Sequence, residues 1–518
     1  MIGTIKNLWE ESFLYQVLLS LYGLMEGSFL FRLGQVKKRG KRASYLYYSS
    51  WACRGIDRLW GGLNRVFAFL HSYYARSFFS LLVEKFRALL AGSRIFGFLK
   101  ARSGFENGGD LLVLVPTLYL LVDFFIRRLP LVNRFGSVWD ELVLVGLFFY
   151  LFCRGVYQGG LPRVRSVMGL PVLLFILLGI THLLIKHEDP AIAIEGFRAM
   201  FQQMFWFFIF IQMIRDKKNL PFLMRVLSFL GLFLGLHACY QYVAGVPMLG
   251  NWTDVTESVR TRAYSIVGSP NILGALFVIL LPMSFYKVFE DRGLFRWLHV
   301  LAVGSMFFGL LFTFSRGAWL SFMVVFLILI FLMNKRLFIP FSYMGLLVLL
   351  TDNPISQRFL HLFSKSYVTS SSKGGRLYRW GIGYRMWERD RIFGQGLGRF
   401  GGAVAINNGL APFYLDNYYL KTLVEMGLFG MVYFVIFVVW LMVFGYKVIS
   451  EQEGRLDVLR AVCIYAGALG VLVQNAVENI FEVPAMMIIF FLYIALLEVL
   501  KAPHKEEEED PSQLGTLA

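Results

Sequence analysis

The chain has 518 residues, of which 57% are hydrophobic and only 16% are charged, and its mean hydropathy is +0.59. A soluble domain is about 45–50% apolar, so this composition excludes an ordinary soluble protein and predicts a membrane protein. The formal net charge of +17 does not indicate nucleic acid, because most Lys and Arg residues fall between apolar segments, where they face anionic lipid headgroups.

Residues 1–110 differ in kind from the rest of the chain. They contain 16 Lys and Arg residues against 7 Asp and Glu residues, and no apolar stretch is long enough to span a bilayer. Apolar residues grouped between basic ones are typical of helices that lie in the headgroup layer. We therefore predict a basic, amphipathic, cytoplasmic membrane-surface region. No cleaved signal peptide is expected.

From residue 111 the chain predicts an all-α, polytopic integral membrane protein with about twelve transmembrane helices, each long enough for a hydrocarbon core of ~30 Å. Nine fall in residues 111–350 and three in residues 417–500, with a long extracytoplasmic loop at 351–416 between them and an acidic cytoplasmic tail at 501–518. The predicted spans are centred near residues 119, 146, 176, 206, 236, 280, 306, 325, 343, 435, 466 and 491.

The charges of the connecting segments predict the orientation. With the N-terminus inside, every inner connection carries Lys or Arg, as the positive-inside rule requires. The basic group Arg127, Arg128 and Arg134 is the one plain exception, on the outer side of the first span. We expect a multi-pass protein of the cytoplasmic membrane with both termini in the cytoplasm.

The sequence predicts neither a cofactor nor a metal site. The four cysteines lie far apart, and their spacing fits neither a zinc site nor a redox site. There is no glycine-rich nucleotide loop ending in Lys and Ser or Thr, and no Asp-x-Asp on an outer loop.

The first candidate site precedes the sixth span, in the sequence RTRAYSIVGSPN. Arg260 and Arg262 lie at the membrane edge on the side where positive charge is disfavoured. The planar guanidinium binds phosphate through two hydrogen bonds, so a lipid diphosphate is the expected ligand. The alternative is that both arginines extend to lipid headgroups beside a helix cap at Asn271.

The second candidate is Arg316, in the sequence FTFSRGAW at the end of the seventh span. An arginine at this depth costs up to about 3 kcal/mol on insertion scales, which predicts a functional partner. Interfacial anchoring is the alternative.

The third candidate is the long outer segment, where nine Lys and Arg residues face four acidic ones. This excess predicts an anionic substrate. Arg376 and Arg379 share one helical face, Trp380 offers a flat apolar face to a sugar ring or anchors at the interface, and glycines follow at 394, 396 and 398.

The fourth candidate is Asp416 with Asn417, at the start of the tenth predicted span. An aspartate there is by default a helix cap. The functional interpretation makes Asp416 the base that accepts a proton from an acceptor hydroxyl, or the group that orients it. Glu425, Glu478 and Glu482 are lesser candidates that pair with the arginines.

Taken in order, these motifs resemble the O-antigen ligase and polymerase superfamily over about residues 220–500. The shared features are SRGAW at the end of a span, an arginine before Pro-Asn, Arg376 four residues before Trp380, a glycine-rich turn followed by Phe400, and Glu425 with Gly427 after the Asp-Asn pair. The resemblance implies a metal-independent, inverting glycosyltransferase that uses undecaprenyl-diphosphate-linked glycans, with Arg262, Arg316 and Arg376 stabilising the leaving diphosphate.

Ligases of this family typically carry His-Asn where this chain has Asp416-Asn417, and this departure favours a polymerase of the cell envelope. The expected partners are a lipid-linked glycan donor, a glycan acceptor, membrane lipids and a chain-length regulator, without nucleic acid. The alternatives are a ligase that transfers glycan to a lipid or protein acceptor, a transporter or flippase of lipid-linked glycans, and a membrane scaffold. A transporter predicts helices interrupted near mid-membrane.

Overall fold

The computed structural model describes residues 51–501 except 75–76, 78–79, 82–84, 86–92, 106, 131, 187, 250–260, 334–337, 352–353 and 362–363. Every regular element among these residues is a helix, which confirms the predicted all-α fold. Residues 502–518 of the predicted acidic tail, the first 50 residues of the predicted surface region and Arg260 lie outside the described residues.

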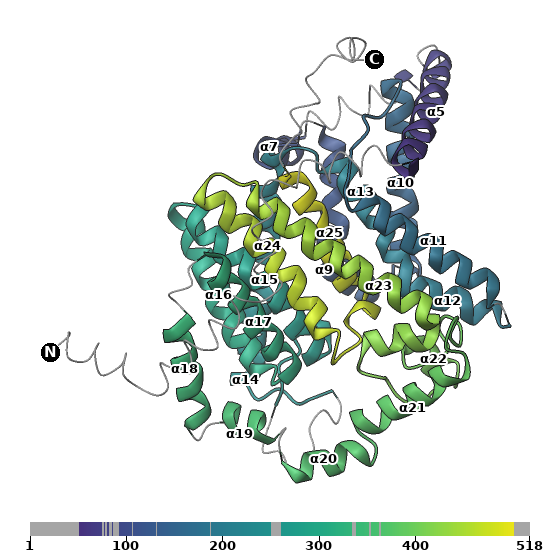
Figure 1. Cartoon of the computed structure of the whole chain (residues 1–518). Helices are drawn as coiled ribbons and strands as arrows, with labels where there is room; N and C mark the ends of the chain where they lie inside the picture. Colours follow the sequence, from purple (N-terminus) through teal and green to yellow (C-terminus); the bar gives the residue numbers. More distant parts are fainter. Residues whose placement is uncertain are drawn as a thin grey trace, which may run out of the picture.

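Of the helices before residue 214, α5, α10, α11, α12 and α13 lie on the right-hand side of the molecule in Figure 1. The amphipathic α5 packs along α10, and its Trp60 indole nitrogen donates to the carbonyl oxygen of Leu161 over 3.1 Å. The elements are α5 (Trp51–Tyr74), α7 (Arg94–Ser103), η1 (Gly108–Val113), α8 (Leu114–Thr117), α9 (Tyr119–Arg128), η2 (Asn133–Phe135), α10 (Trp139–Gln158), α11 (Gly169–Ile185), α12 (Pro190–Phe201), η3 (Gln202–Phe205) and α13 (Trp206–Met213).

The central bundle is built around α15 and α25, which are apolar on all sides and therefore buried. Helix α15 contacts α14, α16, α17 and α24, whereas α25 contacts α13 and α24. The elements are η4 (Lys217–Asn219), α14 (Leu220–Val243), η5 (Ser265–Val267), α15 (Pro270–Glu290), α16 (Gly293–Phe312), α17 (Arg316–Met333), α23 (Tyr418–Ser450), α24 (Arg455–Gln474), η8 (Ile480–Glu482) and α25 (Pro484–Leu500).

The predicted outer segment folds into short helices that form a layer at the lower end of the bundle, away from the C-terminal end of α25 (Figure 1). Charged and glycine-rich sequence between these helices limits each to a few turns. The elements are α19 (Pro354–Leu360), α20 (Lys365–Ser372), α21 (Arg376–Arg389) and α22 (Ala403–Asn407), and they are preceded by α18 (Phe338–Leu350), at the position of the span predicted near residue 343.

Six helices among the described residues are long and apolar enough to cross a membrane: Lys217–Val243, α15, α16, α17, α23 and α24. A seventh is counted if Gly108–Thr117 and Tyr119–Arg128, which are bent by 74°, form one span. Helices α11 and α25 are apolar but shorter, and the span predicted near residue 206 is divided into α12, η3 and α13. These helices support the predicted integral membrane protein. The described residues do not reproduce the predicted count of twelve spans.

Helix α23 is interrupted at Gly427, whose φ of 64° and ψ of −163° lie outside the helical region. The glycine-rich turn after α21 packs into this break. The backbone nitrogen of Gln395 donates to the Val424 oxygen over 2.8 Å, and that of Gly396 donates to the Glu425 oxygen over 3.0 Å. The break thereby attaches the outer segment to the bundle.

Replacing Gly427 with alanine is expected to destabilise the protein by about 1–3 kcal/mol, because this backbone conformation is open essentially to glycine alone. The added Cβ would also collide with the carbonyl oxygen of Ile392. Thermal unfolding in detergent measures the loss. The matched control is Gly304→Ala in α16, where a Cβ meets nothing within 4 Å; equal melting temperatures for the two variants would contradict the prediction.

Candidate functional site

Two arginines of α21 meet two carboxylates from distant segments. Arg376 opens the helix, and its Nη2 lies 2.5 Å from Oε1 of Glu478, which lies between α24 and α25. The Nε of Arg376 lies 3.9 Å from Oδ2 of Asp416, and Nη1 of Arg379 donates to the same oxygen over 3.0 Å. The structure therefore joins the third and fourth sequence candidates.

The first candidate joins the same network through an amide. Arg262 is 6% exposed, and its Nη2 donates to Oδ1 of Asn271 over 2.9 Å. The Nδ2 of Asn271 donates to Oε1 of Glu478 over 2.7 Å. Asn271 is therefore not a simple helix cap, because its two amide atoms connect Arg262 to the carboxylate that pairs with Arg376.

Arg316 approaches the network through a tyrosine. It is the first residue of α17, and its guanidinium carbon lies 5.1 Å from the ring centroid of Tyr367 in α20. The side chain of Tyr367 also hydrogen-bonds with Arg376. The backbone before α17 is held by a further arginine, since Nε of Arg358 donates to the carbonyl oxygen of Phe314 over 2.8 Å.

Asn417, rather than Asp416, caps α23. Its Oδ1 accepts from the backbone nitrogen of Leu420 over 2.9 Å. Asp416 has a φ of 54°, a left-handed conformation that aspartate adopts more readily than most residues. The default interpretation of Asp416 as a cap is therefore wrong, and its carboxylate is left to the arginines.

Trp380 has a positioning role in this structure. Its indole nitrogen donates to the carbonyl oxygen of Leu415 over 3.0 Å, and its ring packs against a small buried cluster of Phe400, Leu415 and Val424. Trp380 thus fixes the backbone that leads into Asp416. Its expected role, in binding a sugar ring or in anchoring at the interface, stays a prediction.

A second buried network lies behind the first. Lys421 Nζ is 2.7 Å from Oε2 of Glu425 and 3.1 Å from Oε1 of Glu482. Oε1 of Glu425 accepts from the backbone nitrogen of Phe400 over 3.1 Å, so Glu425 holds the end of the glycine-rich segment in place. The expectation that Glu425 and Glu482 pair with the arginines is wrong, because both pair with Lys421. Among the described residues, no group of three or more His, Cys, Asp and Glu side chains has the arrangement of a metal site.

Sequence analysis missed Tyr367 and ranked Glu478 too low. Neither lies in a recognisable motif, and both acquire partners about 50 to 100 residues away. The network has an excess of positive charge, because it contains three arginines (Arg262, Arg376 and Arg379) and two carboxylates (Asp416 and Glu478). Arg316 adds a further positive charge. This arrangement favours an anionic ligand next to a carboxylate.

Burial sets the protonation of both carboxylates. It raises the pKa of Glu478 to about 7, although Arg376 acts in the opposite direction. Burial also raises the pKa of Asp416, with Arg376 and Arg379 opposing the shift. Near neutral pH, Glu478 is therefore poised between a neutral acid and an ion-pair partner of Arg376.

The pKa of Glu478 predicts a pH-dependent stability. Because the folded-state pKa exceeds the ordinary 4.5, this group stabilises the folded state fully below pH 4.5, and the contribution is lost as pH rises through about 7. The melting temperature of the detergent-solubilised protein should therefore fall between pH 5 and 8, and Glu478→Gln should flatten that slope. An unchanged slope in the variant would exclude Glu478 as its source.

One family model matches the part of the chain that contains most of this site. Residues 301–435 match the family model described as O-antigen ligase. That match includes Arg316, Arg376, Arg379 and Asp416, whereas a search of curated proteins found no significant match to the chain. Over residues 301–435, the chain is therefore similar to the O-antigen ligase superfamily, in agreement with the resemblance seen in the sequence.

Proposed function

We propose that the protein is a membrane glycosyltransferase that polymerises undecaprenyl-diphosphate-linked oligosaccharide repeats on the outer face of the cytoplasmic membrane. The observation that carries the proposal is the convergence of Arg376, Arg379, Asp416 and Glu478, from three separate segments, into one partly buried network. This network combines groups for an anionic leaving group with a carboxylate suited to a base.

In the proposed reaction, an acceptor hydroxyl attacks the anomeric carbon of the donor, and the bond from that carbon to the diphosphate oxygen breaks. A single displacement inverts the configuration at that carbon. The bonding electrons leave with the diphosphate, and Asp416, whose pKa burial raises, accepts the hydroxyl proton. Arg379, which donates to Asp416, orients the carboxylate.

Arginines stabilise the charge that develops on the departing diphosphate. Arg376, Arg316 and Arg262 carry this role, because preorganised donors in a partly dehydrated site provide strong electrostatic stabilisation. Protonation of Glu478, whose pKa is about 7, releases Arg376 from its ion pair and makes its guanidinium available to the diphosphate. The reaction needs no metal ion in this scheme.

The remaining proposed substrate groups have less direct roles. Asn417 positions α23 and Trp380 positions Leu415, so we propose that both shape the acceptor site next to Asp416. Arg260 precedes Arg262 outside the described residues, and its role in diphosphate binding stays a prediction. A chain-length regulator is a further proposed partner.

The test incubates purified protein with undecaprenyl-diphosphate-linked oligosaccharide in the presence of EDTA and separates the products by size. A ladder of longer glycans with released undecaprenyl diphosphate supports a metal-independent polymerase. Absence of transfer, with candidate acceptors also present, would overturn the proposal and favour a transporter, for which the break at Gly427 offers an interrupted helix.

A ligase is the second candidate, because the matching family model is described as O-antigen ligase. Asp416 in place of the histidine expected in ligases argues for the polymerase. A deletion strain separates the two functions: accumulation of single-repeat lipid-linked intermediates indicates a polymerase, whereas accumulation of long lipid-linked chains indicates a ligase.

A further inference from the structure

A cavity of about 610 Å³ lies at the other end of the molecule from the candidate site. Glu478 of the candidate site lies just before α25, whereas Val499 and Lys501 at the end of α25 line the cavity. A helix of 17 residues is about 25 Å long, so the two sites are separated by roughly the thickness of a hydrocarbon core. In the predicted orientation this cavity faces the cytoplasmic leaflet.

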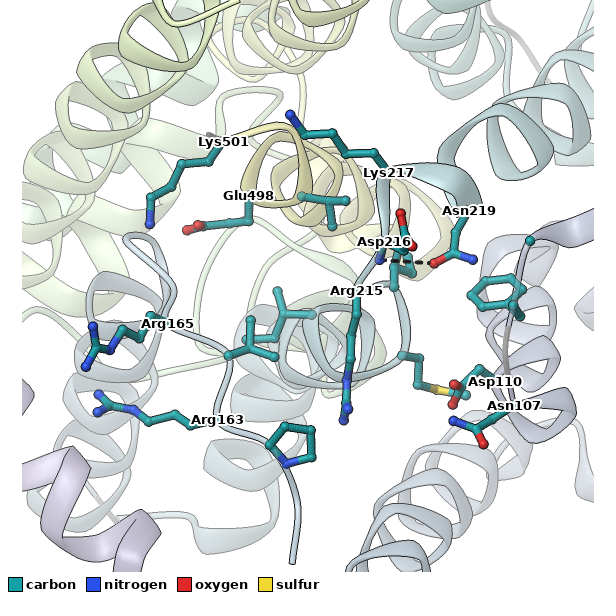
Figure 2. Close-up of a pocket in the computed structure, with 18 of the residues that line it drawn as sticks. Asn107, Asp110, Arg163, Arg165, Arg215, Asp216, Lys217, Asn219, Glu498 and Lys501 are labelled. Carbon is teal, nitrogen blue, oxygen red and sulfur yellow. Dashed lines mark hydrogen bonds between the residues drawn. The ribbon is translucent and has the colours of Figure 1, made fainter. Parts of the chain in front are cut away.

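Six basic side chains from four segments line this cavity, against three acidic ones. Figure 2 shows Arg163, Arg165 and Lys501 gathered on one side and Arg215 extending into the centre. The six basic residues are Arg154, Arg163, Arg165, Arg215, Lys217 and Lys501.

Two of the three acidic groups are already engaged by the protein. Asp110 is paired with Nη1 of Arg154 over 2.5 Å, and Asp216 accepts from the backbone nitrogen of Lys218 over 2.9 Å. The positive-inside rule explains basic residues on this side, but not their convergence on one cavity.

Two buried polar atoms of the lining have no hydrogen-bond partner among the described residues. Asn219 is 3% exposed, and its Nδ2 donor is unsatisfied; Glu498 is 9% exposed, and its Oε2 acceptor is unsatisfied. The other atoms of these side chains are satisfied, since Oδ1 of Asn219 accepts from Asp216 and Oε1 of Glu498 accepts from Ser166. Such atoms are costly without a partner, so they point to a ligand that both accepts and donates hydrogen bonds.

The cavity is also partly apolar. Phe105, Ile211, Ile214 and Val499 line it together with the basic groups. A hydroxylated phosphate ester fits this combination: its phosphate meets the arginines, its oxygens accept from Asn219 and a hydroxyl donates to Glu498. Basic cavities between helices on the cytoplasmic side suit anionic headgroups.

We propose that this cavity binds a hydroxyl-bearing phosphate ester, such as the glycerol phosphate headgroup of an anionic lipid in the cytoplasmic leaflet. The site is distinct from the proposed glycan site, and binding to it does not depend on glycan transfer. A soluble phosphate ester presents the same chemistry, and the experiment separates the two sources.

Native mass spectrometry of the delipidated full-length protein, titrated with phosphatidylglycerol or phosphatidylcholine, tests the proposal. We expect preferential binding of phosphatidylglycerol. The double variant Arg165→Gln with Lys501→Gln should weaken this binding about tenfold or more, because each basic side chain near an anionic headgroup strengthens binding several-fold. The matched control is Arg292→Gln with Arg296→Gln, which removes the same charge from exposed arginines outside the cavity. It should bind like the unmodified protein.

Competition with soluble glycerol phosphate identifies the source of the ligand. If glycerol phosphate displaces the lipid only when it is in large excess over the lipid, the natural ligand is a lipid. If it displaces the lipid at a concentration equal to that of the lipid, the natural ligand is a soluble phosphate ester, which the proposal also includes. Equal weakening by the two variant pairs, or equal binding of both lipids, would overturn it. The proposal would also be overturned if phosphatidylglycerol bound only after removal of residues 504–518. The acidic run Glu506–Asp510 would then be the occupant of the cavity. Melting temperatures confirm that all variants are folded.

Discussion

Replacing Arg316 with alanine is expected to lower glycan transfer by about 100-fold or more while folding and membrane insertion are retained. Removing one preorganised donor from a site of developing negative charge typically has an effect of this size. Arg316 contacts the ring of Tyr367, whereas Asp416 and Glu478 pair with Arg376 and Arg379. Its removal therefore leaves these buried carboxylates paired.

The assay is initial-rate polymerisation with purified protein and a defined lipid-linked donor. Arg389→Ala is the matched control, because Arg389 is exposed at the end of α21 and lies outside the network. The control should retain nearly full activity. Normal transfer by the Arg316 variant would remove this arginine from the mechanism. Arg376→Ala is a less direct test, because it removes the ion-pair partner of Glu478 and is expected to destabilise the protein. A lower rate of transfer in that variant could then reflect a loss of folded protein.

Replacing Asp416 with asparagine is expected to lower the turnover number by about 10²–10⁴-fold, the usual contribution of a general base. Asparagine tolerates the left-handed backbone at φ 54° and can still accept from Arg379. The variant thus removes the basic function while keeping the geometry, and its melting temperature should stay close to that of the unmodified protein.

Two further variants serve as controls for the Asp416→Asn variant. Glu388→Gln removes an exposed carboxylate of α21 that pairs only weakly with Arg391 at 3.5 Å, and it should leave transfer unchanged. In contrast, Asp416→Ala should lower both activity and stability, because alanine is disfavoured in the left-handed conformation. Full activity of Asp416→Asn would show that the acceptor proton leaves by another route.

The sequence by itself determined the class of the protein and the region that contains the candidate site. Long apolar segments have no stable place outside a bilayer, and a helix satisfies its backbone polar groups there, so an all-helical membrane protein followed from composition and periodicity. The segment at 351–416 also stood out, because it carries a larger number of basic residues than the other predicted outer connections. Arg376, Arg379 and Asp416, all named from the sequence, lie together in the structure.

Only the tertiary structure decided which groups pair and which residues merely support them. Glu478 and Tyr367 join the network through contacts with residues far away in the chain, and local spacing contains no information about such pairs. The division of roles between Asp416 and Asn417 depended on one backbone dihedral, and the use of Gly427 depended on the close approach of the segment around Gly394. These features follow from packing between segments, which arises only when the helices assemble and place distant side chains within hydrogen-bonding distance.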